Sequence, residues 1–575
     1  MIFLNKSDDL ICHGTLPQIA DHEGVLASFN LKSQKIKPNS RIIYDYMNAD
    51  VDGLEKYIKE YDFTNNVFNL PPENQTEMFS KVLQDAFAKF VPSKSVLIRP
   101  NDQSWCNSFT RLLLRKKNRN YNFFKKCEAD YRNILDKANP DPEVVTRILQ
   151  RRNKAHDKAR QAANDSAKAN RRAKSEFYNL VNNTLKNPAI SAKKKFNILF
   201  KLMKNNKFSN VPPLIENNVT VQDPLQQSNI FNNFFASKST VLNSDDPVPV
   251  LEKTEGITPL SMVNTSPLEV ARIIRKIKKS HLSHCGIPGK FIHLISTPIS
   301  FSLSRLFNNL FEVGHFPDTW KIAHVIAIHK KSGSKTDKRN FRPISLLPTL
   351  SKICESVMHD RLLKHCQEND IISHKQAAYF KGDSTVSQLL YIVHNIRKNW
   401  VDNKITHGLF LDVSSAFDKV WHSGLLAKLC QAGIEDKFYD IMKSYLENRK
   451  QIIIINGFKS EIADVKAGVP HGSRLGPLLF LIYMNDITQD IESDILIFAD
   501  DTSLFCKGAD PSETARILNS DLEKISIWAA KWKVQFNASK TKDIIFSNKV
   551  LNNSPPLIFG DIFIDRVNLQ KHLGV

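Results

Sequence analysis

The chain has 575 residues and a formal net charge of +21, so we expect roughly two to four compact units and a polyanionic partner. Its eight cysteines include no Cys-x-x-Cys pair, which argues against a disulfide framework or a zinc finger and favours a reducing compartment. The first residues lack the apolar core of a secretion signal, and no run of about 18 apolar residues is present to span a membrane.

The first hundred residues contain two predicted elements. Val25–Phe29 is a predicted strand that follows Asp21 and His22, a pair in which the carboxylate can orient the imidazole as a general base. An ordinary surface loop is the alternative interpretation of that pair. Gln75–Phe90 has the spacing of an amphipathic helix, and Pro92 closes it.

A strongly basic region follows. Trp105–Asn206 contains 25 Lys or Arg against 8 Asp or Glu, with aromatic residues interleaved among the charges. Its composition is helical, and basic residues along helices suit contacts with phosphates, so we expect this region to bind nucleic acid. The alternatives are a solvated helical face, or a nuclear-import patch such as Lys193–Lys195.

Two stretches rich in Pro, Asn and Asp, Asn205–Gln227 and Asn243–Leu260, are predicted linkers around a short aromatic helix at Phe231–Phe235. We expect a domain boundary near residue 255. Ser266–Lys279 is then a predicted helix, because Ser, Pro and Glu occupy its cap, first and third positions.

Four potential zinc ligands lie just beyond that helix. Their order and spacing fit no closed zinc site, so we favour a substrate-binding loop over a metal centre. These residues are His281, His284, Cys285 and His293.

Two adjacent acids near the C-terminal end carry the strongest chemical signal. Ile495–Ala499 and Thr502–Cys506 read as short buried strands, and Asp500 and Asp501 lie in the turn between them. Neighbouring carboxylates against an apolar sheet are costly unless a cation neutralises them. Magnesium is the expected ion, since it takes carboxylate and phosphate oxygens. A plain acidic turn is the alternative.

A third acid ends another predicted strand. Gly408–Asp412 is apolar up to Asp412, and if this strand neighbours the acidic hairpin, three carboxylates meet. Such a set holds up to two magnesium ions roughly 3.5–4 Å apart in two-metal phosphoryl transfer. Phe417 lies one turn further on, where its ring either limits the space beside the sugar of a bound nucleotide or simply packs in the core.

Basic residues flank a predicted loop between two strands. Val325–Ile328 is a short strand that runs into Lys330 and Lys331, and Arg342 precedes a proline beyond the loop. Lysine as a point charge and arginine as a fork can hold a triphosphate from two sides. An ordinary basic hairpin is the alternative.

Three more features complete this part of the chain. The loop that contains Gly468, Gly472 and Ser473 permits close backbone approach to a ligand such as a templating base, or is a simple strand-to-helix turn. Glu513–Trp532 is a predicted amphipathic helix. Lys540 is a candidate general acid for a pyrophosphate leaving group.

Residues from about Ser266 to Val575 resemble the reverse transcriptase of non-LTR retrotransposons of the jockey-like and LINE-like group. The motifs that carry this resemblance follow one another in the family's order and spacing. They are Gly314-His-Phe-Pro317-Asp-Thr-Trp320-Lys321, Phe341-Arg-Pro-Ile-Ser-Leu346, Phe410-Leu-Asp412 with Ala416-Phe417-Asp418, Gly468-Val-Pro470 with Gly472-Ser473 and Leu475-Gly-Pro-Leu478, Phe498-Ala-Asp-Asp501, Asn537 with Lys540-Thr541, and Leu573-Gly574.

The resemblance implies an α+β fold in which a basic, mostly helical region precedes a right-hand polymerase. The fingers would span about 266–405 and the palm about 406–575 of a domain at 255–575, with the thumb largely missing. Asp21-His22 resembles the last motif of an endonuclease/exonuclease/phosphatase-like domain. Residues 1–35 are therefore expected to be its C-terminal remnant, and 36–254 a basic helical connector, in a chain truncated at both ends.

The resemblance also implies roles for individual residues. Asp412, Asp500 and Asp501 would bind two Mg²⁺ ions, or Mn²⁺, with help from the Val413 carbonyl. The triphosphate would be held by Lys330 or Lys331 and by Arg342, and Phe417 would exclude a ribose 2′-OH. The expected partners are an RNA template, a DNA primer or target, and dNTPs, in the nucleus and/or the cytoplasm.

Several positions depart from the family pattern. His471 stands where glutamine is usual, Arg474 where a small apolar residue is usual, and Ala378-Tyr379 where Gly-Phe is usual. The principal hypothesis is an RNA-directed DNA polymerase, and the alternative is an inactive remnant that binds nucleic acid through Trp105–Asn206. Phe417 argues against a third hypothesis, an RNA-templated RNA polymerase.

Overall fold

The computed structural model describes residues 10–19, 22–29, 39–98, 105–136, 141–192, 195, 198, 211–279, 281, 285–330, 332–379, 382–548 and 554–574. The chain divides into two compact units: Met1–Ile43 with Lys94–Phe208, and Tyr44–Ser93 with Ser209–Val575. Among the described residues, no helix combines the length and the apolar content needed to cross a bilayer. Asp21, Lys193, Lys194, His284 and Lys331, which the sequence singled out, lie outside the described residues.

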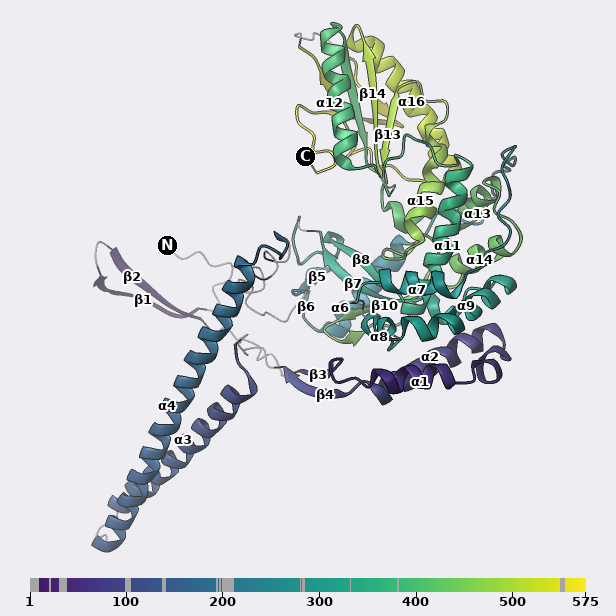
Figure 1. The fold of residues 1–575 in the computed structure, drawn as a ribbon. Helices are drawn as coiled ribbons and strands as arrows, with labels where there is room; N and C mark the ends of the chain where they lie inside the picture. Colours follow the sequence, from purple (N-terminus) through teal and green to yellow (C-terminus); the bar gives the residue numbers. More distant parts are fainter. Residues whose placement is uncertain are drawn as a thin grey trace. The chain divides into compact units, whose positions relative to one another are not determined.

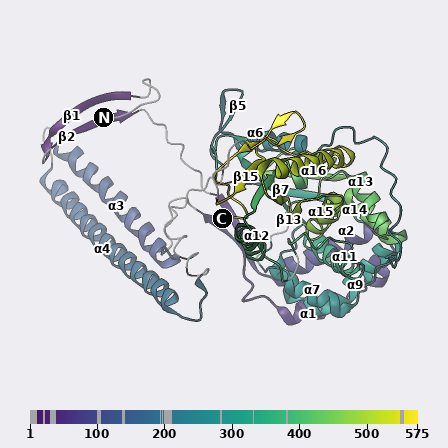
Figure 2. The same cartoon turned by 90° about the horizontal axis from the view of Figure 1, so that it is seen from above.

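The first unit contains a long helical hairpin. Helices α3 (Ser108–Leu135) and α4 (Pro142–Lys186) lie side by side (Figures 1 and 2), as the helical composition of this region predicts. Asn107 closes a capping box with Thr110 at the start of α3, and Asp141 caps α4 in front of Pro142. Small residues of α4, including Ala155, are buried, which allows the helices to pack closely. The unit also holds an antiparallel pair, β1 (Leu10–Ile19) and β2 (His22–Phe29).

The second unit begins with a helical layer that sequence reasoning assigned to the connector. Helices α1 (Val51–Glu60) and α2 (Pro72–Phe90) belong to the same compact unit as residues 209–575. The Glu73 carboxylate of α2 accepts hydrogen bonds from the backbone N–H groups of Asp318 (3.0 Å) and Thr319 (3.2 Å). Helices α1 and α2 therefore pack with the later part of the chain.

One sheet of this unit combines strands that lie far apart in the sequence. Its order is β11-β10-β7-β8, with β12 also paired to β10, and β7 and β10 run parallel. Helix α6 (Pro224–Lys238) packs on this sheet through Phe231, whose ring lies 4.9 Å from that of Phe341. The strands are β7 (Ile322–His329), β8 (Phe341–Leu346), β10 (Arg449–Ile455), β11 (Phe458–Lys459) and β12 (Ala463–Val465).

A second five-stranded sheet has the order β13-β14-β9-β15-β18. Leu496 and Phe505 pack against α12 (Thr385–Val401) on one face, whereas Leu504 packs towards α16 (Pro511–Trp532) on the other. Figure 1 shows both helices beside this sheet. This alternation follows from the two-residue period of a strand. The strands are β9 (Ile405–Leu411), β13 (Asp494–Phe498), β14 (Asp501–Gly508), β15 (Lys542–Phe546) and β18 (Asp565–Arg566).

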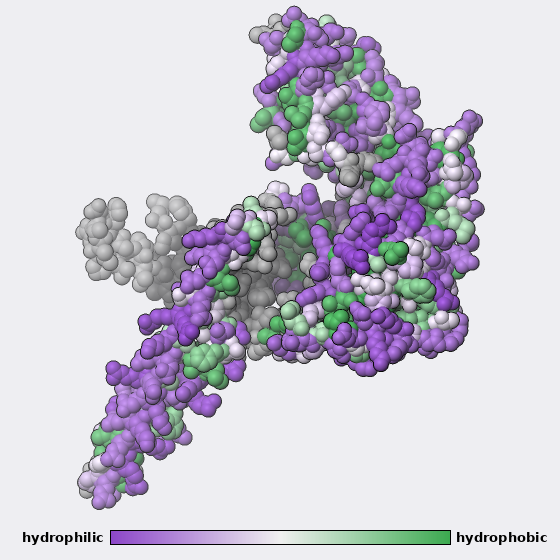
Figure 3. Space-filling model, in the orientation of Figure 1, coloured by the Kyte–Doolittle hydropathy of each residue, from purple (hydrophilic) through white to green (hydrophobic). Residues whose placement is uncertain are grey.

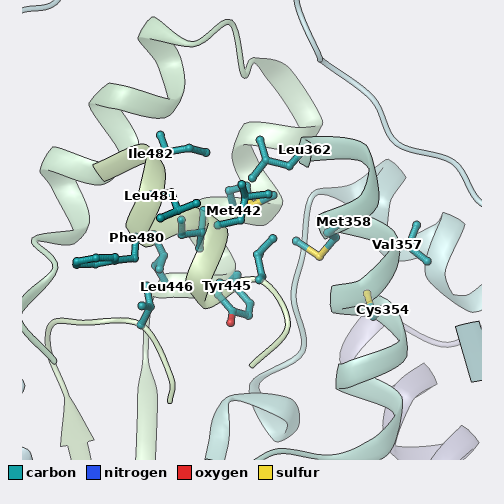
Figure 4. Packing of buried hydrophobic residues seen from close by; sticks show 14 of the residues in the cluster. Cys354, Val357, Met358, Leu362, Met442, Tyr445, Leu446, Phe480, Leu481 and Ile482 are labelled. Atoms are coloured by element: carbon teal, nitrogen blue, oxygen red, sulfur yellow. The ribbon is translucent and has the colours of Figure 1, made fainter. Parts of the chain in front are cut away.

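The main hydrophobic core is built largely from helices. Figure 4 shows Cys354 and Met358 of α11 with Met442 and Tyr445 of α14 and Phe480 of α15, and all five side chains are almost fully buried. Helix α15 is buried along most of its length and supplies much of this contact. These helices are α11 (Thr349–Glu368), α14 (Asp436–Leu446) and α15 (Gly476–Met484).

The remaining elements are shorter or peripheral. The predicted helix capped by Ser266 is confirmed as α7, and β16 pairs with β17 in an antiparallel hairpin. These shorter or peripheral elements are β3 (Asn39–Tyr44), η2 (Thr64–Phe68), β4 (Ser93–Ile98), β5 (Leu214–Glu216), β6 (Val219–Val221), α7 (Pro267–Lys276), α8 (Gly289–Leu294), α9 (Ser296–Val313), α10 (Asp318–Lys321), η3 (Lys338–Asn340), η4 (Ala416–Lys419), α13 (His422–Gln431), η5 (Asn485–Thr488), β16 (Ile558–Phe559) and β17 (Ile562–Phe563). The mixed helix and sheet composition agrees with the predicted α+β class.

Candidate active site

The two adjacent acids lie at a tight turn between β13 and β14. The strands are antiparallel, and Phe498 pairs with Asp501, so Ala499 and Asp500 alone form the connection. Ala499 has a φ of 59°, in the left-handed region that a residue with a Cβ rarely adopts. The predicted hairpin with acids at its tip is therefore present, and its backbone is constrained.

The register of the sheet brings Asp412 beside this turn. Leu411, the last residue of β9, pairs with Thr502 of β14, so Asp412 and Asp501 are the next positions on neighbouring strands. The pKa of Asp501 is raised, first by partial burial and then by the negative charges of Asp500 and Asp412. The three predicted acids thus lie close enough to repel one another, which is a physical reason for a cation at this point.

Lys540 reaches Asp412 from the turn before β15. Asn537 donates its backbone N–H to the Asp412 carbonyl (2.8 Å), which fixes this turn against the end of β9. Lys540 Nζ then lies 3.3 Å from Asp412 Oδ2. Val413, whose carbonyl was a predicted metal ligand, forms an isolated antiparallel bridge with Phe536.

The donor set suits a hard divalent cation by its chemistry. Carboxylate oxygens are the ligands that Mg²⁺ prefers, and the mutual repulsion around Asp501 would be relieved by a positive ion. In the part of the chain that the structure describes, however, no three His, Cys, Asp or Glu side chains are already arranged as a metal site. Asp412 forms an ion pair with Lys540. This lysine therefore supplies positive charge beside the acids.

The predicted triphosphate-binding cations come from the β7–β8 hairpin. Lys330 directly follows β7, and Arg342 lies on β8 opposite Ile328. The Lys330 ammonium donates to the Arg339 carbonyl (3.0 Å). Its pKa is lowered by partial burial and then by the positive charges of Arg342 and Lys540, so the hairpin cations lie near the lysine that contacts Asp412.

Phe417 stands beside the loop that precedes α15. Its ring stacks on Phe480, with 4.5 Å between centroids, and lies 5.2 Å from the ring of His471. The Phe417 carbonyl accepts the backbone N–H of Val469 (2.8 Å). Phe417 is therefore both half-buried and fixed in place, a position compatible with either core packing or a wall of a nucleotide pocket.

The glycines of that loop approach protein backbone. A Cβ on Gly468 would lie 2.6 Å from the carbonyl oxygens of Phe417 and Asp418, and a Cβ on Gly472 would lie 2.7 Å from the Ser345 carbonyl oxygen. Both residues have positive φ. Gly468 therefore allows the loop to lie against η4, and Gly472 allows it to lie against β8. Contact of Gly472 with a ligand stays a prediction.

Ser473 has a local role in addition to its predicted substrate contact. Its hydroxyl donates to the Pro470 carbonyl (2.9 Å) and accepts the backbone N–H of Gly476 (2.9 Å) at the start of α15. These bonds hold the loop against the helix.

The two departures from the family pattern in this loop also have defined partners. His471 Nε2 lies 2.9 Å from Asp418 Oδ1. The Arg474 backbone N–H donates to the buried Glu355 carboxylate (2.9 Å). The histidine is therefore anchored to the acid that follows Phe417.

Other candidates lie elsewhere. His293 Nε2 is hydrogen-bonded to the Ile277 carbonyl (2.7 Å), as expected of a structural histidine. His22 lies on β2. His293 is thus engaged within its own segment.

Sequence reasoning missed Lys238. This last residue of α6 places its ammonium 4.3 Å from the Phe234 ring centroid, and Lys338 approaches the same ring at 5.5 Å. The pKa of Lys238 is lowered by burial and then by the positive charge of Lys330, with Lys540 and Lys419 adding to the effect. The aromatic helix was visible in the sequence, but nothing in the sequence shows that its end faces the β7–β8 hairpin.

Carboxylates at strand ends, with lysine and arginine side chains clustered opposite them, form a site that can bind the phosphates of a nucleotide through divalent cations. Residues 328–555 match the family described as reverse transcriptase (RNA-dependent DNA polymerase). This range includes β9, β13, β14 and β15, and therefore all three acids and Lys540. Residues 328–555 are thus similar to reverse transcriptases, and the chain is similar in sequence to the RNA-directed DNA polymerases from mobile element jockey.

Three relatives illustrate this similarity to RNA-directed DNA polymerases. The RNA-directed DNA polymerase from mobile element jockey of Drosophila melanogaster is 33% identical over 326 residues, which cover 55% of this chain and 35% of the relative. A probable RNA-directed DNA polymerase from transposon BS of the same fly is 27% identical, over 65% of this chain and 43% of the relative. The jockey polymerase of Drosophila funebris is 25% identical over 97% of this chain and 59% of its own length. The chain therefore spans only about a third to three-fifths of these relatives.

Proposed function

We propose that the second compact unit extends a DNA primer on an RNA template with dNTPs. The observation that carries this proposal is the convergence of Asp412, Asp500 and Asp501 at the edge of one sheet, beside Lys540. A transferase for nucleotides needs acidic ligands for metal and cations for phosphate, and both are supplied here by residues within the range 328–555 that is similar to reverse transcriptases. The proposed fingers are built around β7 and β8, and the proposed palm around β9 and β13–β15.

In this mechanism the primer 3′-oxygen forms a bond to the α-phosphorus of the dNTP, and the bond from that phosphorus to the pyrophosphate breaks. Asp412, Asp500, Asp501 and the Val413 carbonyl would hold two Mg²⁺ ions, or Mn²⁺, which would supply positive charge to the reacting phosphate. Lys540, already 3.3 Å from Asp412, donates a proton to the pyrophosphate. The proton of the primer hydroxyl passes to water.

The triphosphate lies between the acidic turn and the β7–β8 hairpin in this proposal. Lys330 and Arg342 share a positively charged neighbourhood with Lys540, and like charges brought together in this way are stabilised by a polyanion. Lys331, Gly472 and Ser473 are further proposed contacts. Phe417 excludes a ribose 2′-OH as a wall beside the sugar, and contacts with the Phe480 and His471 rings hold its ring in place.

Primer extension by the full chain on an RNA template with dNTPs and Mg²⁺ tests this proposal. Wild-type protein should extend the primer, and the double variant Asp500→Asn/Asp501→Asn should not. Asp561→Asn is a matched control, since Asp561 is an exposed acid in the β16–β17 turn. Bound nucleic acid without extension by the wild-type chain would contradict the polymerase and favour a non-enzymatic binding protein.

A second proposed function, nucleic-acid binding by the α3–α4 hairpin, rests on its charge. The two helices carry nineteen Lys or Arg against six Asp or Glu, and the visible face in Figure 3 is mostly hydrophilic. Exposed aromatic rings lie among these cations, for example Tyr121 with Lys125 (5.2 Å) and Phe123 with Arg151 (5.7 Å). Such a surface suits phosphates and unpaired bases.

Use of chromosomal DNA as primer would place the reaction in the nucleus.

A further inference from the structure

The acidic turn is supported by a segment from outside its own hairpin. Gln376 and Ile497 form an isolated parallel bridge beside β13. The Ile497 backbone N–H donates to the Lys375 carbonyl (3.0 Å), and the Ala377 backbone N–H donates to the Ile497 carbonyl (3.0 Å). A short extended stretch before α12 thus runs along the strand that leads into the acids.

The Gln376 side chain makes the contact closest to the acids. Its Oε1 accepts the backbone N–H of Ala499 (3.0 Å) and that of Ala378 (2.9 Å), and the residue is only 5% exposed. Ala499 is the first of the two turn residues and the one with positive φ. One buried amide oxygen therefore binds the turn at its strained residue, immediately before Asp500.

This contact bears on the direction of the acids. In a two-residue turn, the backbone angles of the first residue set where the second residue and the start of the next strand point. Without an acceptor, the Ala499 N–H would be left unpaired in a buried place, and the turn would be free to leave the left-handed region. Metal ligands must be held to within roughly 0.5 Å of their working positions, so such a change would be felt at the metal site.

We propose that Gln376 is a positioning residue, which holds the Ala499–Asp500 turn so that Asp500 and Asp501 converge with Asp412 on divalent cations. This inference rests on the proposed polymerase function. Gln376 lies in the segment before α12 and would act through the turn, without contacting a metal or a substrate itself. Ala378, which replaces the usual glycine, uses its own N–H to complete the same pair of hydrogen bonds.

Gln388 offers a matched control. It is another buried glutamine, 6% exposed, and its Nε2 donates to the Ile497 carbonyl (3.3 Å) on the same strand. Its bond supports β13 two residues before the turn and leaves the Ala499 N–H untouched. A general loss of packing around β13 would therefore follow from Gln388→Leu as much as from Gln376→Leu.

The experiment measures Mn²⁺ binding by electron paramagnetic resonance in the full chain with primer–template bound, and in parallel the Mg²⁺ concentration for half-maximal extension. For Gln376→Leu we expect at least a tenfold weakening of Mn²⁺ binding and a similar rise in the Mg²⁺ requirement, with primer–template affinity changed less than twofold. Gln376→Glu keeps an acceptor oxygen and should stay within threefold of wild type, as should Gln388→Leu. Gln376→Asn, whose shorter side chain withdraws the acceptor, replaces Gln376→Leu if that variant does not fold.

The outcomes separate this inference from the polymerase proposal. Wild-type Mn²⁺ binding that is lost in Asp500→Asn/Asp501→Asn but unchanged in Gln376→Leu would overturn the role of Gln376 and leave the polymerase intact. Equal weakening in Gln376→Leu and Gln388→Leu would also overturn it, because the effect would then be general packing. A wild-type chain that neither binds Mn²⁺ at these acids nor extends a primer would overturn the proposed function itself.

Discussion

The sheet that carries the acids and the α3–α4 hairpin place charge in two different ways. In the sheet, the pairing of Leu411 with Thr502 and of Phe498 with Asp501 fixes each carboxylate to a register, and a slip of one residue would turn it to the other face. In the hairpin, most cations extend from long helices, and the net positive charge matters more than any single position. Single substitutions should therefore be severe in the sheet and mild in the hairpin.

The largest expected effect is at Asp412. Asp412→Asn keeps the shape of the side chain but removes a charge from the proposed metal site, so extension should fall by on the order of 10³-fold. Single-turnover primer extension measures this, with primer–template affinity as the control for folding. Extension within tenfold of wild type would show that the three acids do not act as a set.

Lys540 should come next. Lys540→Gln removes the proposed general acid, and we expect extension to slow by about 10²-fold with little change in primer–template binding. Lys542→Gln is the control, because Lys542 pairs with Asp565 (2.7 Å) on the neighbouring strand instead of with Asp412. An equal loss in both variants would contradict a specific role for Lys540 as the general acid.

Phe417 tests selectivity in place of rate. Phe417→Ala should raise incorporation of ribonucleotides relative to deoxyribonucleotides by about 10- to 100-fold, because it removes the proposed wall beside the sugar. Phe480→Leu disturbs the stacking partner of Phe417 but leaves that ring in place. Discrimination that relaxes equally in both variants would return Phe417 to plain core packing.

The hairpin should respond to salt and to the number of cations removed. Lys116, Lys117 and Arg119 are exposed on α3, and replacing all three by Gln should lower the salt slope of nucleic-acid binding by about 0.7–0.9 for each phosphate that the variant no longer neutralises. The control replaces Arg132, Arg152 and Arg172, which already pair with Glu128 or Glu176. An unchanged slope in the first variant would indicate that this surface is a solvated helical face and does not bind nucleic acid.

The smallest effect is the stability cost of the acids. Because the pKa of Asp501 is raised in the folded protein, the folded state binds the proton more tightly, and stability falls as pH rises from the unfolded value of 3.8 through the folded pKa. Asp501→Asn should therefore raise the melting temperature at pH 7 in the absence of divalent ions, and not below pH 3.8. A lower melting temperature for this variant at pH 7 would contradict the repulsion among the three acids.

Much of the acidic site could be predicted from sequence, because it is made of local patterns. Two short apolar runs around Asp500 and Asp501 predict a hairpin, and an apolar run that ends at Asp412 predicts a strand. The structure adds the register that joins them. The parallel pairing of β7 with β10 connects residues more than a hundred positions apart, and no local pattern of residues 322–329 discloses it.

The contributions that the sequence did not disclose come from outside the motifs. Lys238 lies at the end of a helix that the sequence predicts, but its nearness to Lys330 depends on how Phe231 packs against Phe341. Glu73 likewise reads as a surface acid on α2, and only tertiary packing brings it to the start of α10. Gln376 is a single polar residue in an irregular segment, where neither a period nor a cap marks its role.

The central claim is that Asp412, Asp500 and Asp501 hold the metal ions of nucleotide transfer. The most direct measurement is anomalous diffraction at the manganese edge from crystals of the full chain with an RNA template, a chain-terminated DNA primer, a dNTP and Mn²⁺. Our account predicts manganese peaks between these three carboxylates, with the triphosphate extending towards Lys330 and Arg342. A dNTP bound with its metal away from Asp412 and the β13–β14 turn would contradict it.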